Sequence, residues 1–315
     1  MKLSVAMCTY NGAQYIRKQL ESIINQLLNV DEIIVCDDGS TDNTLVVVYE
    51  FANLYTNIKW HIEQNSHSLG VKKNFEKAIN LCSEDIIFLA DQDDVWRNDK
   101  TKVIVDFLEQ NPKVNVVFTD ADFIGTEGEL LTRHSLLDAA CLLPNMRYWV
   151  KCLRFEIFAE CNRATGATMA FRRSFISQFM PISDHIGLHD EQIAMAAIVN
   201  DSIGLIPEKL ISYRLHASNV VGIPKYNWIY TNRACPDLLD LIVVPRYKED
   251  YVRFKDMRVT FYKLRSLNTR SLAFKLKLTL LWPFYLFLYR RYWWHFFLFD
   301  VFPSLRLKLC KHSKI

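Results

Sequence analysis

Segments of strand length alternate with helical segments from residue 2 to residue 124, and this alternation most constrains the fold. The strand-like runs are KLSVAMCT, DEIIVCD, NIKWHIEQ, DIIFLA and VNVVFTDADFI. The segments with apolar residues at helical spacing are AQYIRKQLESIINQLL, TLVVVYEFANLY, VKKNFEKAINLC and KTKVIVDFLEQN. Strands that alternate with helices predict an α/β fold, with a Rossmann-like, mostly parallel sheet flanked by helices. Ser40 or Thr41 is expected to cap the second helix.

The composition limits the class of protein without naming a partner. The chain has 315 residues, half of them hydrophobic, and a formal net charge of +3. Its eight cysteines are scattered and form no C-x-x-C pair, which indicates a reduced, cytosolic protein without a structural zinc site. The opening run MKLSVAMCTYNG reads as a strand rather than a signal peptide. Basic residues concentrate only in an aromatic tail, so we expect no nucleic-acid partner.

Polar residues follow the predicted strands, at the sheet edge where α/β proteins bind ligands. They are Thr9, Tyr10 and Asn11, then Asp37, Asp38, Gly39 and Ser40, then Gln64 and Asn65, and finally Asp91, Asp93 and Asp94. Polar turn residues alone could explain much of this set. Three acids in the run DQDD repel one another, however, and a divalent cation such as Mg²⁺ or Mn²⁺ would compensate them. Because the sequence has no Walker lysine and no G-x-G-x-x-G motif, a metal would hold the phosphates of a ligand.

Seven motifs, in order over residues 2–222, resemble those of family 2 glycosyltransferases with the GT-A fold. They are SVAMCTYNGAQYIRKQLESIINQ, EIIVCDDGSTDNT, NSHSLGVKKNFEKAI, IIFLADQDDVW, TGATMAF, LHDEQIAMAA and ISYRLHASNVVG. The third, sixth and seventh are also similar to the bacterial rhamnosyltransferase-like branch of the family. The resemblance implies a nucleotide-sugar donor, a Mn²⁺ or Mg²⁺ ion, and transfer to a hydroxyl group with inversion at the anomeric carbon.

The resemblance also assigns residues around the donor. The nucleotide-binding set is Thr9, Tyr10, Asn11, Asp38, Lys73 and Asp91. Asp91 and Asp93 form the D-x-D pair, and Asp93 and Asp94 are the implied metal ligands. Either Lys72 or Lys73 could reach the diphosphate, or both could simply lie on a solvated helix face.

The remaining motifs imply groups that face the sugar and the acceptor. Asp190 matches the family's catalytic base, with Glu191 as the alternative base and His189 as an orienting or phosphate-contacting residue. Simple capping of a helix by these acids is the structural alternative. RATGATMAF reads as a small-residue loop that enters a strand, and its Gly166 and Ala167 would approach the sugar or form a tight turn. From the last motif, Arg214 and His216 would help neutralise the diphosphate, and His216 could bind metal.

The resemblance fades after residue 222. We therefore predict a catalytic domain at 1–222 and a helical region at 223–315. Residues 271–310 combine aromatic and basic side chains, but their longest charge-free stretch, 278–289, is shorter than the about 20 residues that span a bilayer. They favour an anchor in the membrane interface at the cytoplasmic face of the inner membrane. Packing on the catalytic domain and a homodimer interface are the alternatives.

The function predicted from these observations is metal-dependent, inverting glycosyl transfer to a lipid-linked or polysaccharide acceptor in bacterial cell-surface polysaccharide synthesis. The expected donor is dTDP-rhamnose, followed by UDP-galactose or UDP-glucose. Two alternatives belong to other classes: a nucleotidyltransferase acting on a sugar phosphate, and a non-catalytic protein that binds a sugar nucleotide.

Overall fold

The computed structural model describes residues 1–139, 162, 164–184, 187–217 and 219 of the chain. These residues belong to one compact unit formed by Met1–Phe155 and Asn162–Ile223. The predicted helical region at 223–315, with its membrane anchor, lies outside the described residues, and the boundary at residue 222 stays a prediction. Within the described part of the chain, no helix is both long and apolar enough to cross a membrane.

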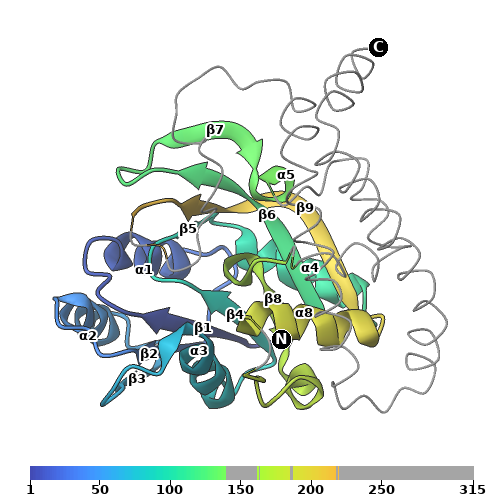
Figure 1. Cartoon of the computed structure of the whole chain (residues 1–315), viewed down its shortest axis with the longest axis horizontal. Helices are drawn as coiled ribbons and strands as arrows, with labels where there is room; N and C mark the ends of the chain where they lie inside the picture. Colours follow the sequence, from blue (N-terminus) through green and yellow to red (C-terminus); the bar gives the residue numbers. More distant parts are fainter. Residues whose placement is uncertain (140–161, 163, 185–186, 218, 220–315) are drawn as a thin grey trace, which may run out of the picture. The chain divides into compact units, whose positions relative to one another are not determined.

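Strands and helices alternate through the first 124 residues, as the sequence predicts, except that the short β5 follows β4 directly (Figure 1). The strands are β1 (Leu3–Thr9), β2 (Glu32–Asp37), β3 (Lys59–Gln64), β4 (Ile86–Ala90), β5 (Val95–Trp96), β6 (Val116–Ile124), β7 (Leu130–Ser135), β8 (Ala170–Arg172) and β9 (Ile203–Arg214). The α-helices are α1 (Ile16–Ile24), α2 (Thr44–Leu54), α3 (Gly70–Leu81), α4 (Lys100–Gln110), α5 (Leu136–Ala139) and α8 (His189–Val199). Two 3₁₀ helices, η1 (Gly166–Thr168) and η2 (Arg173–Gln178), flank β8.

One half of the sheet is parallel and runs in the order β3-β2-β1-β4. Thr9 at the end of β1 pairs with Asp37 of β2, which pairs with Gln64 of β3, so three carboxyl ends lie level at one edge. The chain moves outward from β1 to β3 and then returns past β1 to reach β4. Because crossovers are right-handed, this reversal places α3 on the face opposite α1 and α2. It also makes the gap between the ends of β1 and β4 the expected ligand crevice.

The other half of the sheet is mixed, so the prediction of a mostly parallel sheet is wrong for this half. β8 runs antiparallel to both β4 and β6, and β6 then pairs in parallel with β9. β5 and β7 add antiparallel pairings to β9 and β6. The direction of β8 follows from η1, which contacts β4 and directly precedes β8. The chain enters β8 from the carboxyl edge of β4 and must run away from that edge.

Strand β9 was not expected from the sequence. It contains Pro207, and a proline cannot donate a ladder hydrogen bond. The structure accommodates it with a break in register, because Thr119 pairs with Ile206 while the next residue, Asp120, pairs with Lys209. The strand resumes beyond the break and ends at Arg214, which delivers the YRLHASN motif to the carboxyl edge of the sheet.

The predicted cap of α2 is wrong, because neither Ser40 nor Thr41 occupies the cap position. The Ser40 hydroxyl instead donates to Asp37 at 2.5 Å. The carboxylate of Asp42 accepts the backbone N–H of Thr44 at 3.0 Å, at the start of the helix, and that of Ala13 at 3.0 Å, beyond β1. Asp42 therefore ties the start of α2 to the loop that follows β1.

Helix α8 is buried almost all round, and it contacts α3, β6 and β9. Its residues from Ile193 to Ile198 are apolar, and a helix that is apolar on every side is stable only inside a core. Because this helix is buried, the residues His189 and Asp190 of the LHDE motif in its first turn are buried as well.

Candidate active site

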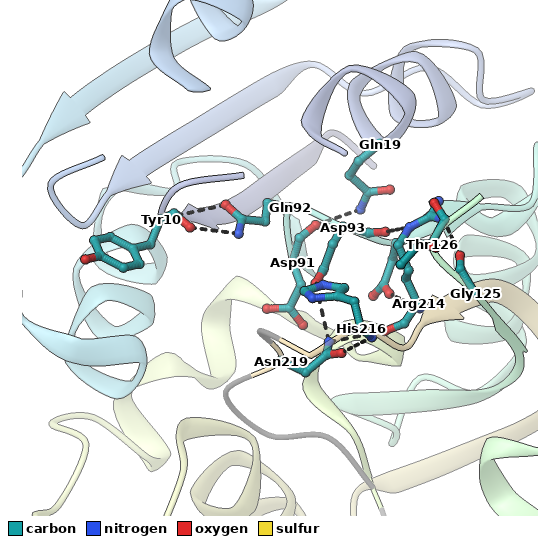
Figure 2. Close-up of polar contacts among 11 residues, drawn as sticks. Tyr10, Gln19, Asp91, Gln92, Asp93, Gly125, Thr126, Arg214, His216 and Asn219 are labelled. Carbon is teal, nitrogen blue, oxygen red and sulfur yellow. Dashed lines mark hydrogen bonds and ion pairs between the residues drawn. The ribbon is translucent and has the colours of Figure 1, made fainter. Parts of the chain in front are cut away.

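The side-chain amide of Gln92 joins the loop after β4 to the loop after β1 (Figure 2). Its Oε1 accepts the backbone N–H of Tyr10 at 2.8 Å, and its Nε2 donates to the Tyr10 carbonyl at 3.0 Å. The amide lies so close to Gly12 that a Cβ there would be 2.1 Å from Oε1. This clamp holds the two loops at the expected crevice and leaves the Tyr10 side chain 55% exposed.

The buried carboxylate of Asp37 organises the edge between β1, β2 and β3. It accepts hydrogen bonds from the Thr9 hydroxyl at 2.7 Å, the Ser40 N–H at 2.7 Å and the Gln64 amide at 3.1 Å. Asn11, at a φ of 48°, donates its N–H to the Ser40 hydroxyl at 2.8 Å. Thr9 and Asn11, two predicted nucleotide-binding residues, therefore shape the loop that presents Tyr10.

Asp38 fixes the loop that leads into α3. Its carboxylate accepts hydrogen bonds from the side chains of Asn65 at 2.9 Å and Ser68 at 2.7 Å, and from the backbone of Leu69 at 2.7 Å and Gly70 at 3.0 Å. Burial alone would raise the pKa of Asp38, but these hydrogen bonds outweigh burial and hold the pKa below its ordinary value. The structure places this residue at the predicted edge, with its oxygens already bonded within the protein.

The last motif meets the DQDD loop through His216 (Figure 2). The His216 Nε2 lies 2.7 Å from Oδ2 of Asp93, and its ring stacks on Tyr15 with 4.9 Å between centroids. The His216 and Asp93 side chains are only 10% and 12% exposed. Asn219 reinforces the contact by accepting the His216 backbone N–H at 2.6 Å. Two motifs more than 120 residues apart in the sequence thus meet at one carboxylate.

The other two acids of the loop are held in surroundings that oppose their ionisation. Asp94 is 1% exposed; its Oδ1 accepts the Arg214 N–H at 3.0 Å, while Oδ2 has no hydrogen-bond partner within the described residues. Burial, together with the charges of Asp93 and Asp91, raises the pKa of Asp94 well above its ordinary value. Burial and the charges of Asp93 and Asp190 raise the pKa of Asp91 to about 7. A cation among these carboxylates would relieve both effects.

Arg214 is buried and fixes the DQDD loop through hydrogen bonds to the backbone. Its Nε donates to the Asp93 carbonyl at 2.7 Å, and its Nη1 donates to the Gly125 carbonyl at 2.6 Å. The guanidinium lies 4.9 Å from the Tyr15 ring centroid. Figure 2 shows it between the loop and the turn after β6. Within the described residues the guanidinium donates to backbone carbonyls, as a residue that positions the acids would, and its expected contact with a diphosphate stays a prediction.

We expect Arg214→Met to lower the free energy of unfolding by about 3 kcal/mol, because buried carbonyls lose their donor. Urea denaturation of the full chain measures this change. Arg97→Met is the matched control, since Arg97 is 39% exposed and its ion pairs with Asp99 and Glu208 should contribute less than about 1 kcal/mol. An Arg214 variant that loses no more stability than the Arg97 variant would contradict this role.

Two backbone N–H groups fix the buried carboxylate of Asp190. Its Oδ2 accepts from Gly166 at 2.9 Å and its Oδ1 accepts from Glu191 at 2.7 Å. Burial raises the pKa of Asp190 to about 6, even though both N–H groups lower it. A Cβ at Gly166 would lie 3.1 Å from Nε2 of His189 and 3.4 Å from Cβ of Asp190, so a larger residue there would require these side chains to shift slightly.

The neighbours of Asp190 take roles that differ from its own. His189 is 4% exposed and stacks on Phe75 at 4.0 Å, and neither ring nitrogen has a hydrogen-bond partner in the described residues. Burial lowers the pKa of His189 to about 3, so the ring is neutral. This favours an orienting role over a contact with phosphate. The Glu191 carboxylate accepts the Gly187 N–H at 2.9 Å, which fits the role of an acid at a helix N-terminus.

Lys72 and Lys73 both bind the segment at 182–184. Lys73 donates to Glu76 at 2.8 Å and to the Ile182 carbonyl at 3.0 Å, while Lys72 donates to the Ser183 carbonyl at 3.2 Å. Both amines therefore hold this segment against α3, and the predicted contact of Lys73 with the nucleotide stays a prediction.

Lys100 is a site residue that sequence reasoning missed. It is fully buried at the start of α4, donates to the Ala167 carbonyl at 3.0 Å, and lies 3.8 Å from the Trp96 ring centroid. Burial lowers the pKa of Lys100 to about 7, although the charges of Asp94 and Asp91 oppose this shift. The amine therefore forms a hydrogen bond to the predicted sugar loop, at Ala167, and interacts with the acidic loop through the charges of Asp94 and Asp91.

The acidic loop suits a metal that is held only partly by protein. The described residues contain no group of three His, Cys, Asp or Glu side chains that could hold an ion by themselves. Magnesium is commonly bound by one or two carboxylates, with waters and substrate phosphates as the other ligands. The unpartnered Oδ2 of Asp94 and the adjacent Asp93 carboxylate fit that kind of site.

The fold and this site define a GT-A-like α/β protein with a carboxylate cluster at the carboxyl edge of its sheet. The profile of the family described as "Glycosyl transferase family 2" matches residues 4–179, more than half of the chain. The chain therefore belongs to this family, which confirms the resemblance seen in the motifs, and it is a glycosyltransferase. The LHDE and YRLHASN motifs lie beyond the matched residues.

Two curated relatives are glycosyltransferases named for particular donors. The dTDP-rhamnosyl transferase RfbG of Shigella flexneri is 42% identical over 228 residues, 69% of this chain and 73% of that protein. An Escherichia coli UDP-Gal:alpha-D-GlcNAc-diphosphoundecaprenol beta-1,3-galactosyltransferase is 30% identical over 118 residues, 37% of this chain and 42% of that protein. The longer match supports the same family assignment.

Solved structures confirm the type of fold. The mannosyltransferase PcManGT of Pyrobaculum calidifontis, solved with GDP-Man and Mn²⁺, has a TM-score of 0.55 at 16% identity and covers 98% of this chain and 86% of its own. TarS 1–349 of S. aureus, solved with UDP-GlcNAc, has a TM-score of 0.54 at 18% identity and covers 86% of this chain and 68% of its own. At these identities the likeness concerns the fold alone.

Proposed function

We propose that the chain is a metal-dependent inverting transferase that moves a hexose from a nucleoside diphosphate to an acceptor hydroxyl group. The observation that carries this proposal is geometric: Asp190 accepts the N–H of Gly166 in η1 at 2.9 Å, and η1 packs against β4, the strand that leads into the DQDD loop. The base and the acidic loop for a metal diphosphate, about 100 residues apart in the sequence, therefore lie at the same end of β4.

Asp190 has the properties that a base for this reaction requires. In a single displacement, the acceptor oxygen forms a bond to the anomeric carbon while the bond from that carbon to the phosphate oxygen breaks. The bonding electrons leave with the diphosphate, and the hydroxyl proton passes to Asp190. With a pKa of about 6, this carboxylate is ionised at neutral pH yet more basic than an exposed aspartate. Its two backbone hydrogen bonds fix the orientation of the carboxylate.

The acidic loop would receive the leaving group. Asp93 and Asp94 would hold Mn²⁺ or Mg²⁺, and the bound ion would supply Lewis-acid stabilisation of the departing diphosphate. Arg214 and His216 keep these carboxylates in place through the Asp93 carbonyl and carboxylate. Gln92 holds the backbone of Tyr10, and the exposed Tyr10 ring is available to stack on the base of the nucleotide. Thr9, Asn11 and Asp38 support the surrounding loops.

The relatives favour dTDP-rhamnose as the donor. The relative with 42% identity over most of both chains is named a dTDP-rhamnosyl transferase. UDP-galactose is second, supported by the shorter match to a galactosyltransferase, and UDP-glucose is third. The name of that galactosyltransferase includes a diphosphoundecaprenol acceptor, which supports a lipid-linked acceptor here. Such an acceptor would place the enzyme at the cytoplasmic face of the inner membrane. Family membership favours transfer over nucleotidyl transfer and over a purely binding role.

We expect dTDP-rhamnose with Mn²⁺ to raise the melting temperature of the full chain, and we expect EDTA to abolish the shift. At 100 times Kd, a ligand that binds only the folded state stabilises it by about 2.7 kcal/mol. For a domain of this size that corresponds to a shift of roughly 5–10 °C. UDP-galactose, UDP-glucose and GDP-mannose are the comparison donors. If none of the donors shifts the melting temperature of a folded sample, the donor-binding proposal is wrong.

A further inference from the structure

The side-chain amide of Gln92 continues the pairing of β1 with β4 after the backbone pairing has ended. The paired residues run from Leu3 to Met7 on β1, and β4 leaves the ladder after Ala90 to form the DQDD loop. Tyr10, three residues beyond Met7, still has a backbone N–H and a backbone carbonyl that need partners. The Gln92 amide serves both, accepting the N–H at 2.8 Å and donating to the carbonyl at 3.0 Å. It does what a further peptide group of β4 would do.

The residue after Tyr10 is held by a different part of the chain. Asn11 donates its N–H to the Ser40 hydroxyl at 2.8 Å, and its side-chain oxygen accepts the Thr41 N–H at 2.9 Å. These bonds fix the loop after β1 to the loop between β2 and α2. The backbone of Tyr10 is instead fixed to the DQDD loop, through Gln92. Breaking this one contact should therefore affect Tyr10 more than the rest of its loop.

The DQDD loop has anchors that do not involve the side chain of Gln92 (Figure 2). The buried Gln19 of α1 donates to the Asp91 carbonyl at 3.0 Å. On the other side, Arg214 donates to the Asp93 carbonyl at 2.7 Å. Because both anchors bind the backbone of the loop, removal of the Gln92 amide should leave the acids in place and release Tyr10.

Gly12 leaves the space that the Gln92 amide occupies. A Cβ at Gly12 would lie 2.1 Å from Oε1 and 2.3 Å from Cδ of Gln92. The backbone of Gly12 does not have a positive φ, so alanine is compatible with its conformation. The end of a glutamine side chain can move, and a methyl group at this position would therefore displace the amide from Tyr10. The chain thus offers a second way to break the same contact, from outside the DQDD motif.

We propose that Gln92 is a positioning residue for the donor, which fixes Tyr10 so that the exposed ring meets the nucleotide base at a set distance from the metal-binding acids. This inference rests on the proposed function and adds a residue to it. The base and the diphosphate of a donor are joined covalently, so both can bind well only if their two sites keep the right spacing. A contact that sets this spacing before binding lowers the ordering cost of binding.

We expect Gln92→Ala to bind dTDP about fivefold more weakly than wild type in the presence of Mn²⁺. Tyr10→Ala should lose about tenfold, in the lower part of the range for stacking of an aromatic ring on a base. Calorimetric titration of the full chain with dTDP at saturating MnCl₂ measures both values. Gln110→Ala is the matched control, because Gln110 is an exposed glutamine at the end of α4, and it should bind like wild type.

Two double variants test whether Gln92 acts through Tyr10. In the Tyr10→Ala background, Gln92→Ala should cause no further loss of dTDP affinity, because the ring that it positions is absent. Gly12→Ala alone should weaken binding about as much as Gln92→Ala. In the Gln92→Ala background, Gly12→Ala should have no effect, because the amide that its methyl group displaces is gone. A residue that only stabilised the fold or the acidic loop would give losses that add in both pairs.

Unchanged dTDP affinity in Gln92→Ala, or the same loss with and without the Tyr10 ring, would overturn the proposal. If Gln92→Ala does not fold, Gln92→Met keeps the volume of the side chain and takes its place; failure of both to fold would show a structural role and also overturn the proposal. If wild type binds UDP and not dTDP, the same variants are titrated with UDP. Absence of binding of either nucleotide to wild type is a distinct result, which contradicts the proposed donor binding itself.

Discussion

Asp190→Asn is expected to reduce transfer about a thousandfold while metal-dependent donor binding stays within a few fold of wild type. The amide keeps the size of the side chain and can still accept one of the two backbone hydrogen bonds, from Gly166 or Glu191. It cannot take a proton from the acceptor hydroxyl group. The rate should therefore fall without loss of the donor complex. Single-turnover transfer and the donor-induced thermal shift, measured on the same sample, separate these two effects.

Glu191→Gln is the control for this variant, because Glu191 is the alternative base and its neighbour. Its carboxylate accepts the Gly187 N–H at 2.9 Å, and an amide oxygen can accept the same bond. We expect transfer within a few fold of wild type. If Glu191→Gln loses activity as severely as Asp190→Asn, or if Asp190→Asn turns over normally, the base is not Asp190.

The pH profile gives a further readout of the same base. Burial raises the pKa of Asp190 to about 6, and only the deprotonated form accepts a proton. The wild-type transfer rate should therefore be constant above that pH and fall as the pH drops through about 6. Asp190→Asn should lose this acidic limb, and Glu191→Gln should keep it. The profile is measured with saturating donor and metal, so that changes in binding do not enter the rate.

The sequence predicts the parallel half of the sheet well because its signal is local. The apolar runs of β1, β2 and β4 are buried on both faces, and periodicity within a short window is enough to find them. The mixed half depends on tertiary context. β5 has two residues, which is too short for periodicity to register, and the three-residue β8 is predicted only as the strand that the RATGATMAF loop enters, without its direction. β9 carries a proline, whose effect the structure absorbs in a break of register with β6.

In the site, too, some features follow from local sequence motifs, whereas others depend on tertiary contacts. The motifs predict that Asp93, His216 and Arg214 belong to one region, and the structure brings all three together. The motifs do not reveal that the Arg214 guanidinium donates to backbone carbonyls, because the orientation of this side chain depends on the turn after β6. Lys100 gives no signal at all, because in NDKTKV it looks like Lys102, which is exposed. Only the position of the acidic loop relative to α4 makes one lysine buried and the other solvated.

Asp93→Ala is expected to abolish the metal-dependent part of donor binding and to lower kcat/KM more than about 100-fold. Losing a residue that merely supports a metal ligand typically costs 10–100-fold in metal affinity, so losing a ligand should cost at least as much. The substitution also removes the partner of His216, whose Nε2 lies 2.7 Å from the carboxylate. The thermal shift induced by dTDP-rhamnose should then be the same with Mn²⁺ and with EDTA.

Asp99→Ala is the matched control, because Asp99 lies just beyond the same loop, is 30% exposed and pairs with Arg97. It should leave the metal-dependent shift intact, so a loss in Asp93→Ala alone locates the effect at the buried acids. His216→Ala separates the two consequences of losing Asp93, since it removes the partner and keeps the carboxylate. A metal-dependent shift of wild-type size in Asp93→Ala would exclude Asp93 as a ligand. The unpartnered carboxylate oxygen of Asp94 would then be the oxygen to test next.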